Sequence, residues 1–496
     1  MLVNILQQKH LLGYGEVLRN KLFYKINRLN NKQIDEISSS KLTNIITNDV
    51  VQLETAVAMW IRLVIRVPFI CIGALVMCTI ISIKCAVILF IATIILAMVT
   101  FIVAKKASPL YKISREKLDK LSFRVKENLQ NVRVVRGFSA EKEEMKKFEK
   151  ENKENYIYAK RAYIASRYVK SSNYSYFKYY NIAILYFSSF QIWRGDLSKG
   201  QLIAIINYIS QMLLAIIVFS NLIMIYTRAY TSAIRVKSVL DIKLQDDKYE
   251  DNKIENNNIE LKNISFSYTD KKFIKDFNLK IKKGEILGII GQAGSGKSTL
   301  LKLLNRSYEP SLGKIYIGSE DIDKYSNEKI KESIVLISQK TDFFKVSIKE
   351  NVVLGRENIT DEDVINALKR SCAWEFVKNL PNGINTVLEN NASNLSGGQK
   401  QRISIARCFI GNPKIILLDD STSALDKKTE TEVWKNIYDY VSKNKITTVV
   451  CSQKISAFKY ADNILVLANG KIEAIDKKEN IEKVSKTYKE MKSLSE

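Results

Sequence analysis

Histidine is almost absent from this sequence, because the chain of 496 residues contains a single one, His10. Cysteine is scarce as well: there are six, and none belongs to a CxxC pair or has a histidine close by in the sequence. Structural zinc sites are built from clusters of cysteine and histidine, and disulfide-stabilised domains are dense in cysteine. The sequence therefore predicts neither a zinc site nor a disulfide framework.

Acidic residues are in deficit, and the formal net charge of the chain is +25. The excess is mostly lysine spread along the whole chain, with no basic stripe interleaved with aromatic residues. A nucleic-acid partner is therefore not expected. Part of the excess flanks long apolar runs, as in the cytoplasmic loops of membrane proteins.

Long apolar runs occur only before about residue 230. We expect membrane-spanning helices at about 64–83, 85–104, 177–194 and 202–226, because such runs can cross a hydrocarbon core of about 30 Å. Buried helices of a large soluble protein are the alternative, which the uncharged run 85–104 disfavours. The basic segments before the first pair of runs and between the pairs are expected to lie in the cytoplasm.

After about residue 255, short apolar runs alternate with polar ones, as in an α/β domain. Within this part, GQAGSGKST follows the strand-like stretch GEILGII and precedes an amphipathic helix, the setting that the phosphate-binding motif G-x-x-x-x-G-K-[ST] requires. Backbone amides of such a loop surround phosphate oxygens, the lysine reaches the β- and γ-phosphates, and the serine hydroxyl ligates Mg²⁺. The predicted binding residues are Gly291, Gln292, Ala293, Gly294, Ser295, Gly296, Lys297, Ser298 and Thr299.

Two further motifs follow in order, LSGGQ at 395–399 and IILLDD at 415–420. With them, residues 259–494 resemble the nucleotide-binding domain of an ATP-binding cassette (ABC) transporter, which implies ATP and Mg²⁺ as ligands. The resemblance assigns Tyr268 to stacking on adenine, and Gln339, Asp419 and Ser298 to Mg²⁺. It also implies that SALD at 423–426 crosses a dimer interface, and that a partner's ATP is contacted by the signature residues Ser396, Gly397, Gly398 and Gln399.

Residues 1–240 resemble the membrane domain of exporters with six helices per half, including two cytoplasmic helical extensions, and a linker is expected at 241–258. By this resemblance the first helix and part of the second are absent, so the chain is expected to be a fragment or a mis-started gene product, or else the missing piece is encoded separately. The expected fold is a polytopic all-α membrane domain followed by an α/β phosphate-loop domain with a helical signature subdomain. A multi-pass location in the cell membrane, with the nucleotide-binding domain in the cytoplasm, goes with it.

Two positions depart from the family pattern. Asp420 stands where the family has a glutamate that polarises the attacking water, and Gln453 stands where it has a histidine that contacts the γ-phosphate. Asp420 alone is compatible with drift, because a carboxylate remains. Both changes together predict a site that binds ATP but cleaves it poorly, since glutamine is neither titratable nor cationic and a displaced base is a poor catalyst.

An intact signature beside a degenerate site favours one half of a heterodimer, whose partner is a second half-transporter with the glutamate and histidine in place. The alternatives are a homodimeric exporter with slow sites, and a truncated regulatory or inactive paralogue that binds ATP. The substrate is expected to be hydrophobic or amphipathic, with drugs, lipids and peptides all open.

Overall fold

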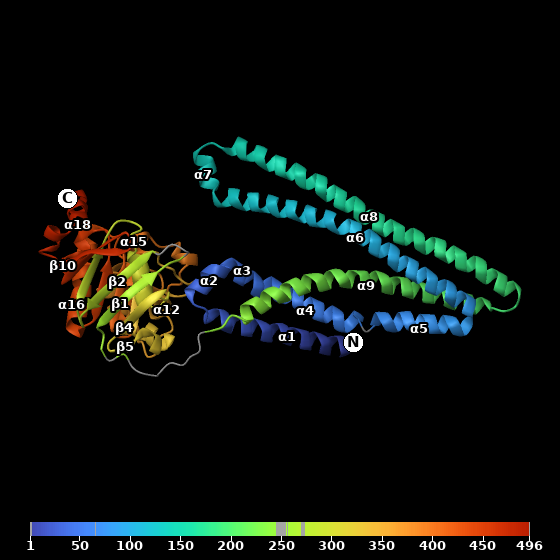
Figure 1. Ribbon diagram of the computed structural model, residues 1–496, viewed down its shortest axis with the longest axis horizontal. Coiled ribbons are helices and arrows are strands. Elements are labelled where there is room, and N and C mark those ends of the chain that lie inside the picture. Colours follow the sequence, from blue (N-terminus) through green and yellow to red (C-terminus); the bar gives the residue numbers. More distant parts are fainter. Residues whose placement is uncertain (1, 65, 245–253, 255, 269–272, 496) are drawn as a thin grey trace. The chain divides into compact units, whose positions relative to one another are not determined.

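The computed structural model describes residues 2–64, 66–244, 254, 256–268 and 273–495, and Figure 1 shows the chain as a ribbon. The chain divides into two compact units. The first contains Met1–Arg28 and Ile37–Lys243, and the second contains Leu29–Glu36 and Leu244–Glu496. The short segment Leu29–Glu36 therefore groups with the C-terminal half, which the sequence did not predict. The expected linker at 241–258 lies largely outside the described residues.

Among the described residues of the first unit, the regular elements are all helices, and two of them, η1 and η2, are π-helical. Its elements, with the short α2 that joins it to the second unit, are α1 (Leu2–Asn27), α2 (Asn31–Ile37), α3 (Ser39–Asn44), η1 (Ile45–Asp49), α4 (Val50–Met59), η2 (Trp60–Val64), α5 (Arg66–Ile81), α6 (Ile83–Gln130), α7 (Val132–Gly137), α8 (Glu141–Trp193) and α9 (Lys199–Leu240).

Local sequence explains where several of these helices begin. The Ser198 hydroxyl caps α9 by accepting a hydrogen bond from the Gln201 backbone N–H, and the Gln201 side-chain oxygen accepts one from the Ser198 backbone N–H. The break between α5 and α6 falls at Ser82, which is extended, so Lys84 lies in the first turn of α6 rather than between two helices. α6 then continues as one helix past Pro109.

Length and hydropathy identify only some of the predicted membrane-spanning helices among the described residues. Among the described residues, the helix Ser39–Ile81 is long and apolar enough to cross a membrane, and Ile83–Ile95 is a shorter apolar stretch. The runs predicted at 177–194 and 202–226 lie in α8 and α9, and several of their side chains fall outside the described set. The topology of four spans stays a prediction.

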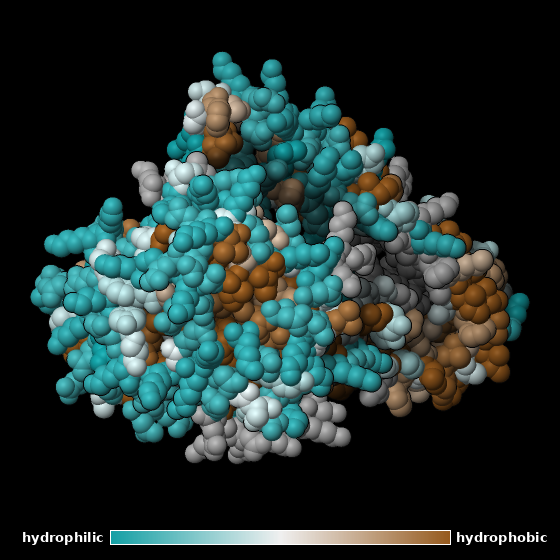
Figure 2. Space-filling view, turned by 60° about the vertical axis from the view of Figure 1, so that its left-hand side comes forward, coloured by the Kyte–Doolittle hydropathy of each residue, from teal (hydrophilic) through white to brown (hydrophobic). Residues whose placement is uncertain are grey.

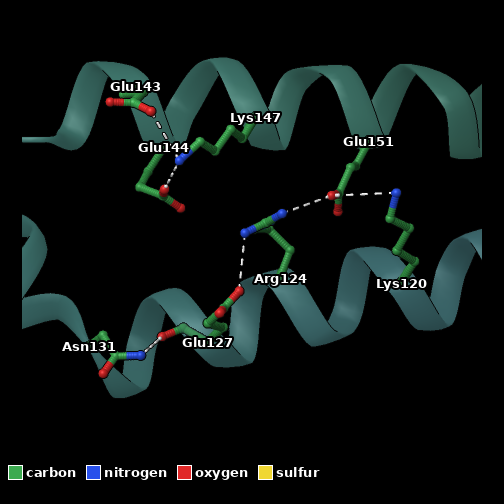
Figure 3. Close-up of polar contacts among 8 residues, drawn as sticks. All are labelled: Lys120, Arg124, Glu127, Asn131, Glu143, Glu144, Lys147 and Glu151. Atoms are coloured by element: carbon green, nitrogen blue, oxygen red, sulfur yellow. Dashed lines mark hydrogen bonds and ion pairs between the residues drawn. The ribbon is translucent and has the colours of Figure 1, made fainter.

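Outside its apolar stretch, α6 pairs with α8 through a ladder of charged side chains, which Figure 3 shows in part. Arg124 of α6 contacts Glu151 of α8 at 3.2 Å and Glu127 of its own helix at 3.1 Å. Lys120 reaches the same Glu151 carboxylate at 3.8 Å. Glu151 is buried, but Lys120 and Glu127 are exposed, and water and salt weaken the pairs that they make. The charged ladder nevertheless indicates that this part of the helix pair lies in water.

The second unit contains two β-sheets. The smaller is antiparallel with the order β2-β1-β4-β5, and the larger has the order β10-β9-β3-β8-β7-β6. The larger sheet is parallel except for the pairing of β9 with β10. The strands are β1 (Ile259–Phe266), β2 (Ile274–Ile281), β3 (Ile286–Ile290), β4 (Leu312–Ile317), β5 (Glu320–Asp321), β6 (Ile334–Ile337), β7 (Ile415–Asp419), β8 (Thr447–Cys451), β9 (Asn463–Ala468) and β10 (Lys471–Lys477).

The strands of the larger sheet are apolar at successive positions because both faces of the sheet are covered. In β3, Leu287 and Ile289 pack into one core, and Ile286 and Ile290 pack into a second core on the opposite face. The α-helices of this unit are α10 (Lys297–Leu304), α11 (Asn327–Ser333), α12 (Ile348–Val353), α13 (Asp361–Arg370), α14 (Trp374–Val377), α15 (Gly397–Ala406), α16 (Lys427–Asn444), α17 (Ile481–Val484) and α18 (Lys486–Ser495).

The helices α12 to α15 form a subdomain with a core of its own, in which Ile348, Val364, Leu368 and Ile403 are fully buried. The face of the second unit that comes forward in Figure 2 is mainly hydrophilic, with hydrophobic side chains scattered over it. A helical unit is thus followed by an α/β unit that carries a helical subdomain, as the sequence predicted.

Candidate functional site

The predicted phosphate loop lies where the sequence placed it, between the end of β3 and the start of α10. β3 is an inner strand of the larger sheet, with β9 and β8 on either side. Gly294 and Gly296 have φ angles of 79° and 113°, which only glycine adopts without strain. At position 291 glycine is required because there is no room for a side chain: an added Cβ would lie 2.2 Å from the carbonyl oxygen of Leu467. The loop is therefore a bare backbone cradle followed by a helix N-terminus, which favours an anion.

The side chain of Lys297 points into this loop. Its Nζ donates hydrogen bonds to the carbonyl oxygens of Gly291 and Gln292, at 2.7 and 2.9 Å. Burial lowers the pKa of this ammonium group, and the nearby Cys451, Asp419 and Asp420 oppose that shift. A largely buried cation whose hydrogen bonds go to neutral carbonyl oxygens gains from an anionic neighbour.

The hydroxyl of Ser295 is a second sign that the loop fits a ligand. Ser295 is 5 % exposed, and its Oγ has no hydrogen-bond partner among the described residues. Buried hydroxyls are normally paired. An orphaned donor inside the cradle, together with the Lys297 ammonium group, matches the oxygens of a phosphate chain.

Two of the three predicted Mg²⁺ ligands, Asp419 and Ser298, come together at the ends of two elements. Asp419 ends β7, and Ser298 lies in the first turn of α10. The pKa of the Asp419 carboxyl is raised, mainly by burial and also by the neighbouring Asp420, while a hydrogen bond from the Ser298 side chain opposes the rise. A hydroxyl beside a buried carboxylate is the kind of oxygen pair that Mg²⁺ binds, and binding would relieve the burial of the charge.

Asp420 has both carboxylate oxygens occupied by protein donors. Oδ1 accepts a hydrogen bond from the Ser452 hydroxyl at 3.1 Å, and Oδ2 accepts one from Gln339 Nε2 at 3.3 Å. The backbone is fixed as well, since Asp420 has a φ of 45° and its N–H donates to the Cys451 carbonyl at 2.8 Å. Gln339 and Asp420 are thus brought together as two members of one network.

Ser452 is a site residue that the sequence reasoning missed. It is 2 % exposed, follows β8 directly and precedes Gln453, which is exposed. The sequence signal that could have identified Ser452 is its position directly before Gln453. In the structure, β7 and β8 are parallel neighbours, and Asp419 pairs with Cys451. The residues that follow these two paired positions therefore meet.

Tyr268 is half exposed and has a fixed ring. Its hydroxyl is 3.1 Å from the Thr299 hydroxyl, and its ring makes edge-to-face contacts with Phe266 and Tyr308, at centroid distances of 4.8 and 5.3 Å. Tyr308 in turn donates a hydrogen bond to Asp35 of α2. Burial and this hydrogen bond raise the pKa of the Tyr308 hydroxyl. Tyr308 and Asp35 were not predicted, since they lie 273 positions apart in the sequence.

The predicted signature residues form the start of α15. Ser396 caps the helix by accepting a hydrogen bond from the Gln399 backbone at 3.3 Å, and the Gln399 side chain accepts one from the Ser396 backbone at 2.9 Å. Gly398 packs against the backbone of Ala424, where an added Cβ would lie 3.0 Å from the carbonyl oxygen. A serine-capped N-terminus with glycine behind it is open to a phosphate group.

The Gln401 side chain ties this helix to the segment 423–426. Its Nε2 donates to the Ser423 hydroxyl at 3.0 Å, and its Oε1 accepts from the Ala424 backbone at 2.8 Å. Among the described residues, no hydrogen bond joins Ser396–Gln399 to the phosphate loop of the same chain. The signature and the loop are therefore separate features of the second unit.

Comparisons with known proteins agree with this geometry. Residues 274–423 match the ABC transporter family, and residues 12–216 match the ABC transporter transmembrane region. The chain is 33 % identical over 457 residues to the ABC transporter ATP-binding protein YfiB of Bacillus subtilis, covering 92 % of this chain and 79 % of that protein. It is 28 % identical over 466 residues to YknU of the same organism, covering 92 % and 78 %.

A partial relative and a solved structure are also similar to this chain. A Staphylococcus aureus protein named for multidrug export is 41 % identical over 210 residues, which is 42 % of this chain and 36 % of that protein. The solved structure of a bacterial Atm1-family ABC exporter with ATP bound superposes with a TM-score of 0.84 at 21 % identity, covering 99 % of this chain and 88 % of that one.

The match to YfiB extends over most of both proteins and takes in the helical and the α/β units alike. The phosphate loop lies between β3 and α10, and the predicted signature residues lie at the start of α15. The chain therefore belongs to the ABC transporter family, as a membrane protein with the exporter fold, in which a transmembrane region precedes a cytoplasmic ATP-binding domain.

Proposed function

We propose that this chain is one half of a heterodimeric exporter, which holds Mg-ATP at its own phosphate loop and completes the hydrolytic site of its partner. The observation that carries the proposal is the state of Asp420, whose two carboxylate oxygens already accept hydrogen bonds from Ser452 and Gln339. A carboxylate engaged in this way is poorly placed to accept a proton from water. It is also one methylene shorter than the glutamate of the family, and a misplacement near 1 Å can cost about a hundredfold in rate.

Nucleotide binding rests on other residues of the chain. Gly291–Thr299 would surround the phosphates, Lys297 would neutralise their charge, and Tyr268 would stack on the adenine. Ser298, Gln339 and Asp419 would hold Mg²⁺, which neutralises charge on the phosphate oxygens when it is bound. Gln339 can serve the metal without leaving Asp420, because its Nε2 donates to Asp420 and the metal would take its other amide atom, the oxygen Oε1.

The partner's site would receive the N-terminus of α15. Ser396 and the backbone amides after it offer hydrogen-bond donors, and Gln401 fixes this helix to the segment that the family places at the dimer interface. An intact signature would have no use in a protein that only binds ATP, so its presence favours a working complex. The partner proposed is a second half-transporter with glutamate and histidine at the positions of Asp420 and Gln453.

For the membrane part, we propose a bilayer-embedded domain with four spans in this chain and the basic segments in the cytoplasm. Export of hydrophobic or amphipathic molecules is proposed from the similarity to the Staphylococcus aureus protein named for multidrug export.

In the proposed four-span topology, Lys126 faces the cytoplasm. Modification of a cysteine at position 126 by an impermeant reagent added outside intact cells would contradict it.

The proposal predicts that the chain purified by itself, in detergent or nanodiscs, binds Mg-ATP but turns it over slowly. The physical reason is that the engaged Asp420 and the neutral Gln453 replace both residues that act on the attacking water and the γ-phosphate. Steady-state phosphate release measures this. Rapid turnover by the chain alone would instead assign it to a homodimeric exporter.

A further inference from the structure

Three helical segments of the first unit lie side by side and form a stem, which we define as α1, the η1–α4 segment and α9 (Figure 1). Two acidic side chains of the middle segment contact the other two helices. Asp49 ends η1 and contacts α9, and Glu54 lies in α4 and contacts α1. The middle segment is thus held on both sides.

The contact with α9 is a bidentate ion pair between the buried Asp49 and the partly exposed Arg235. Asp49 is 2 % exposed, and its carboxylate accepts hydrogen bonds from Arg235 Nε at 2.7 Å and from the Ser232 hydroxyl at 2.8 Å. The second guanidinium nitrogen, Nη2, reaches the same carboxylate and also the Ser232 hydroxyl. A planar fork on a carboxylate fixes position and angle, which a single ammonium group cannot do.

The contact with α1 depends on a glycine. Arg19 pairs with both oxygens of Glu54, each at 3.1 Å. The Glu54 carboxylate lies against Gly15, where an added Cβ would fall 1.3 Å from Oε1. The close approach of α1 and α4 at this point therefore needs a residue without a side chain.

Apolar packing alone would not fix the register of these helices. Leu22, Ile45 and Val50 are fully buried in the stem, but the hydrophobic effect has no direction and tolerates sliding. Buried ion pairs add little net stability, and their best-attested use is to select one register. The π-helical turn Ile45–Asp49 supports a special role, because such turns are frequent at functional sites.

Two helices of the stem, α1 and α9, are followed in the sequence by segments of the ATP-binding half. α1 leads directly into Leu29–Glu36, which belongs to the second unit, and the chain after α9 enters that unit at Leu244. The helices that Asp49 and Glu54 join are therefore the ones whose ends continue into the second unit.

We propose that the Asp49–Arg235–Ser232 and Glu54–Arg19 contacts act as a polar clamp that makes the stem move as one rigid body. A movement at the membrane end of any one helix is then passed to the connections after α1 and α9 together. The clamp does not depend on the proposed inequality of the ATP sites.

Distance measurement between two spin labels tests the clamp in the full chain. The six native cysteines are replaced, and labels are attached at the exposed positions Asn20 of α1 and Lys237 of α9. The intact clamp is expected to give one narrow distance distribution that stays in place when Mg-ATP is added. Asp49→Asn keeps the size but removes the charge, and it is expected to add a population displaced by about one helical turn, roughly 5 Å.

Three further variants keep the test valid even if one of the variants fails to fold. Glu54→Gln weakens the other contact and is expected to broaden the distribution, and Arg235→Lys keeps the charge without the fork and is expected to be intermediate. Arg228→Gln alters an exposed arginine of the same helix and should change nothing. A narrow, unshifted distribution in both Asp49→Asn and Glu54→Gln overturns the clamp, as does a shift of the unmodified stem on adding Mg-ATP. The nucleotide-free measurement stands even if the chain binds no ATP.

Discussion

Replacing Ser396 by arginine is expected to abolish most ATP turnover by the assembled complex, whereas Asp420→Asn is expected to lower it only slightly. Ser396 caps α15 with its hydroxyl, and in the proposed complex this helix N-terminus faces the γ-phosphate of the partner's site. Arginine fills that space and removes the cap, which by itself is worth about 0.5–2 kcal/mol. Loss of a donor to the reacting phosphate typically costs about a hundredfold or more in rate.

Asp420→Asn leaves the chain's own site little changed. The asparagine carbonyl can still accept from Ser452, and the Gln339 amide can turn its oxygen towards the new NH₂ group. Steady-state phosphate release by the complex purified with its partner measures both effects. Ser393→Arg is the matched control, since Ser393 is exposed and lies three positions before Ser396. If Asp420→Asn silenced the complex while Ser396→Arg left it active, the competent site would belong to this chain.

Lys297→Ala is expected to weaken binding of ATP by this chain strongly. The ammonium group is buried in the loop and donates to the carbonyl oxygens of Gly291 and Gln292, so it is pre-positioned for phosphate. A hydrogen bond to a charged group is worth about 1.5–3 kcal/mol, which corresponds to roughly a ten- to hundredfold change in Kd.

Equilibrium titration with a fluorescent ATP analogue measures this change in the full chain. Lys283→Ala is the control, because Lys283 is exposed in the turn before β3. The melting temperature of each variant shows whether the fold is retained. Equal affinity of Lys297→Ala and the unmodified chain for the ATP analogue would show that the phosphate loop does not bind ATP in the proposed way.

Much of the ATP-binding half could be predicted from the sequence because its signals are local. The glycines at 291, 294 and 296 and the helix that follows are specified within one short stretch, and the structure places them between β3 and α10. The cap of α15 is local as well, since Ser396 and Gln399 are three positions apart. The order of a helical part and an α/β part followed from the change in apolar patterning near residue 230.

The contacts that give the site its character could not be predicted, because they join distant segments. Ser452 meets Asp420 only through the pairing of β7 with β8. Tyr308 meets Asp35 across 273 positions, and Arg235 meets Asp49 across 186. The π-helical turn that ends at Asp49 also has no composition signal, since it depends on the packing of neighbouring helices.

The unequal-site account is tested most directly by mixing the assembled complex with ATP labelled in its γ-phosphate and stopping the reaction within one turnover. The account predicts that the partner's nucleotide is cleaved quickly while the nucleotide at this chain's loop remains ATP. Restoring the family residues by Asp420→Glu and Gln453→His should convert the second nucleotide as well. Cleavage of all bound ATP at a single rate by the unmodified complex would contradict the account.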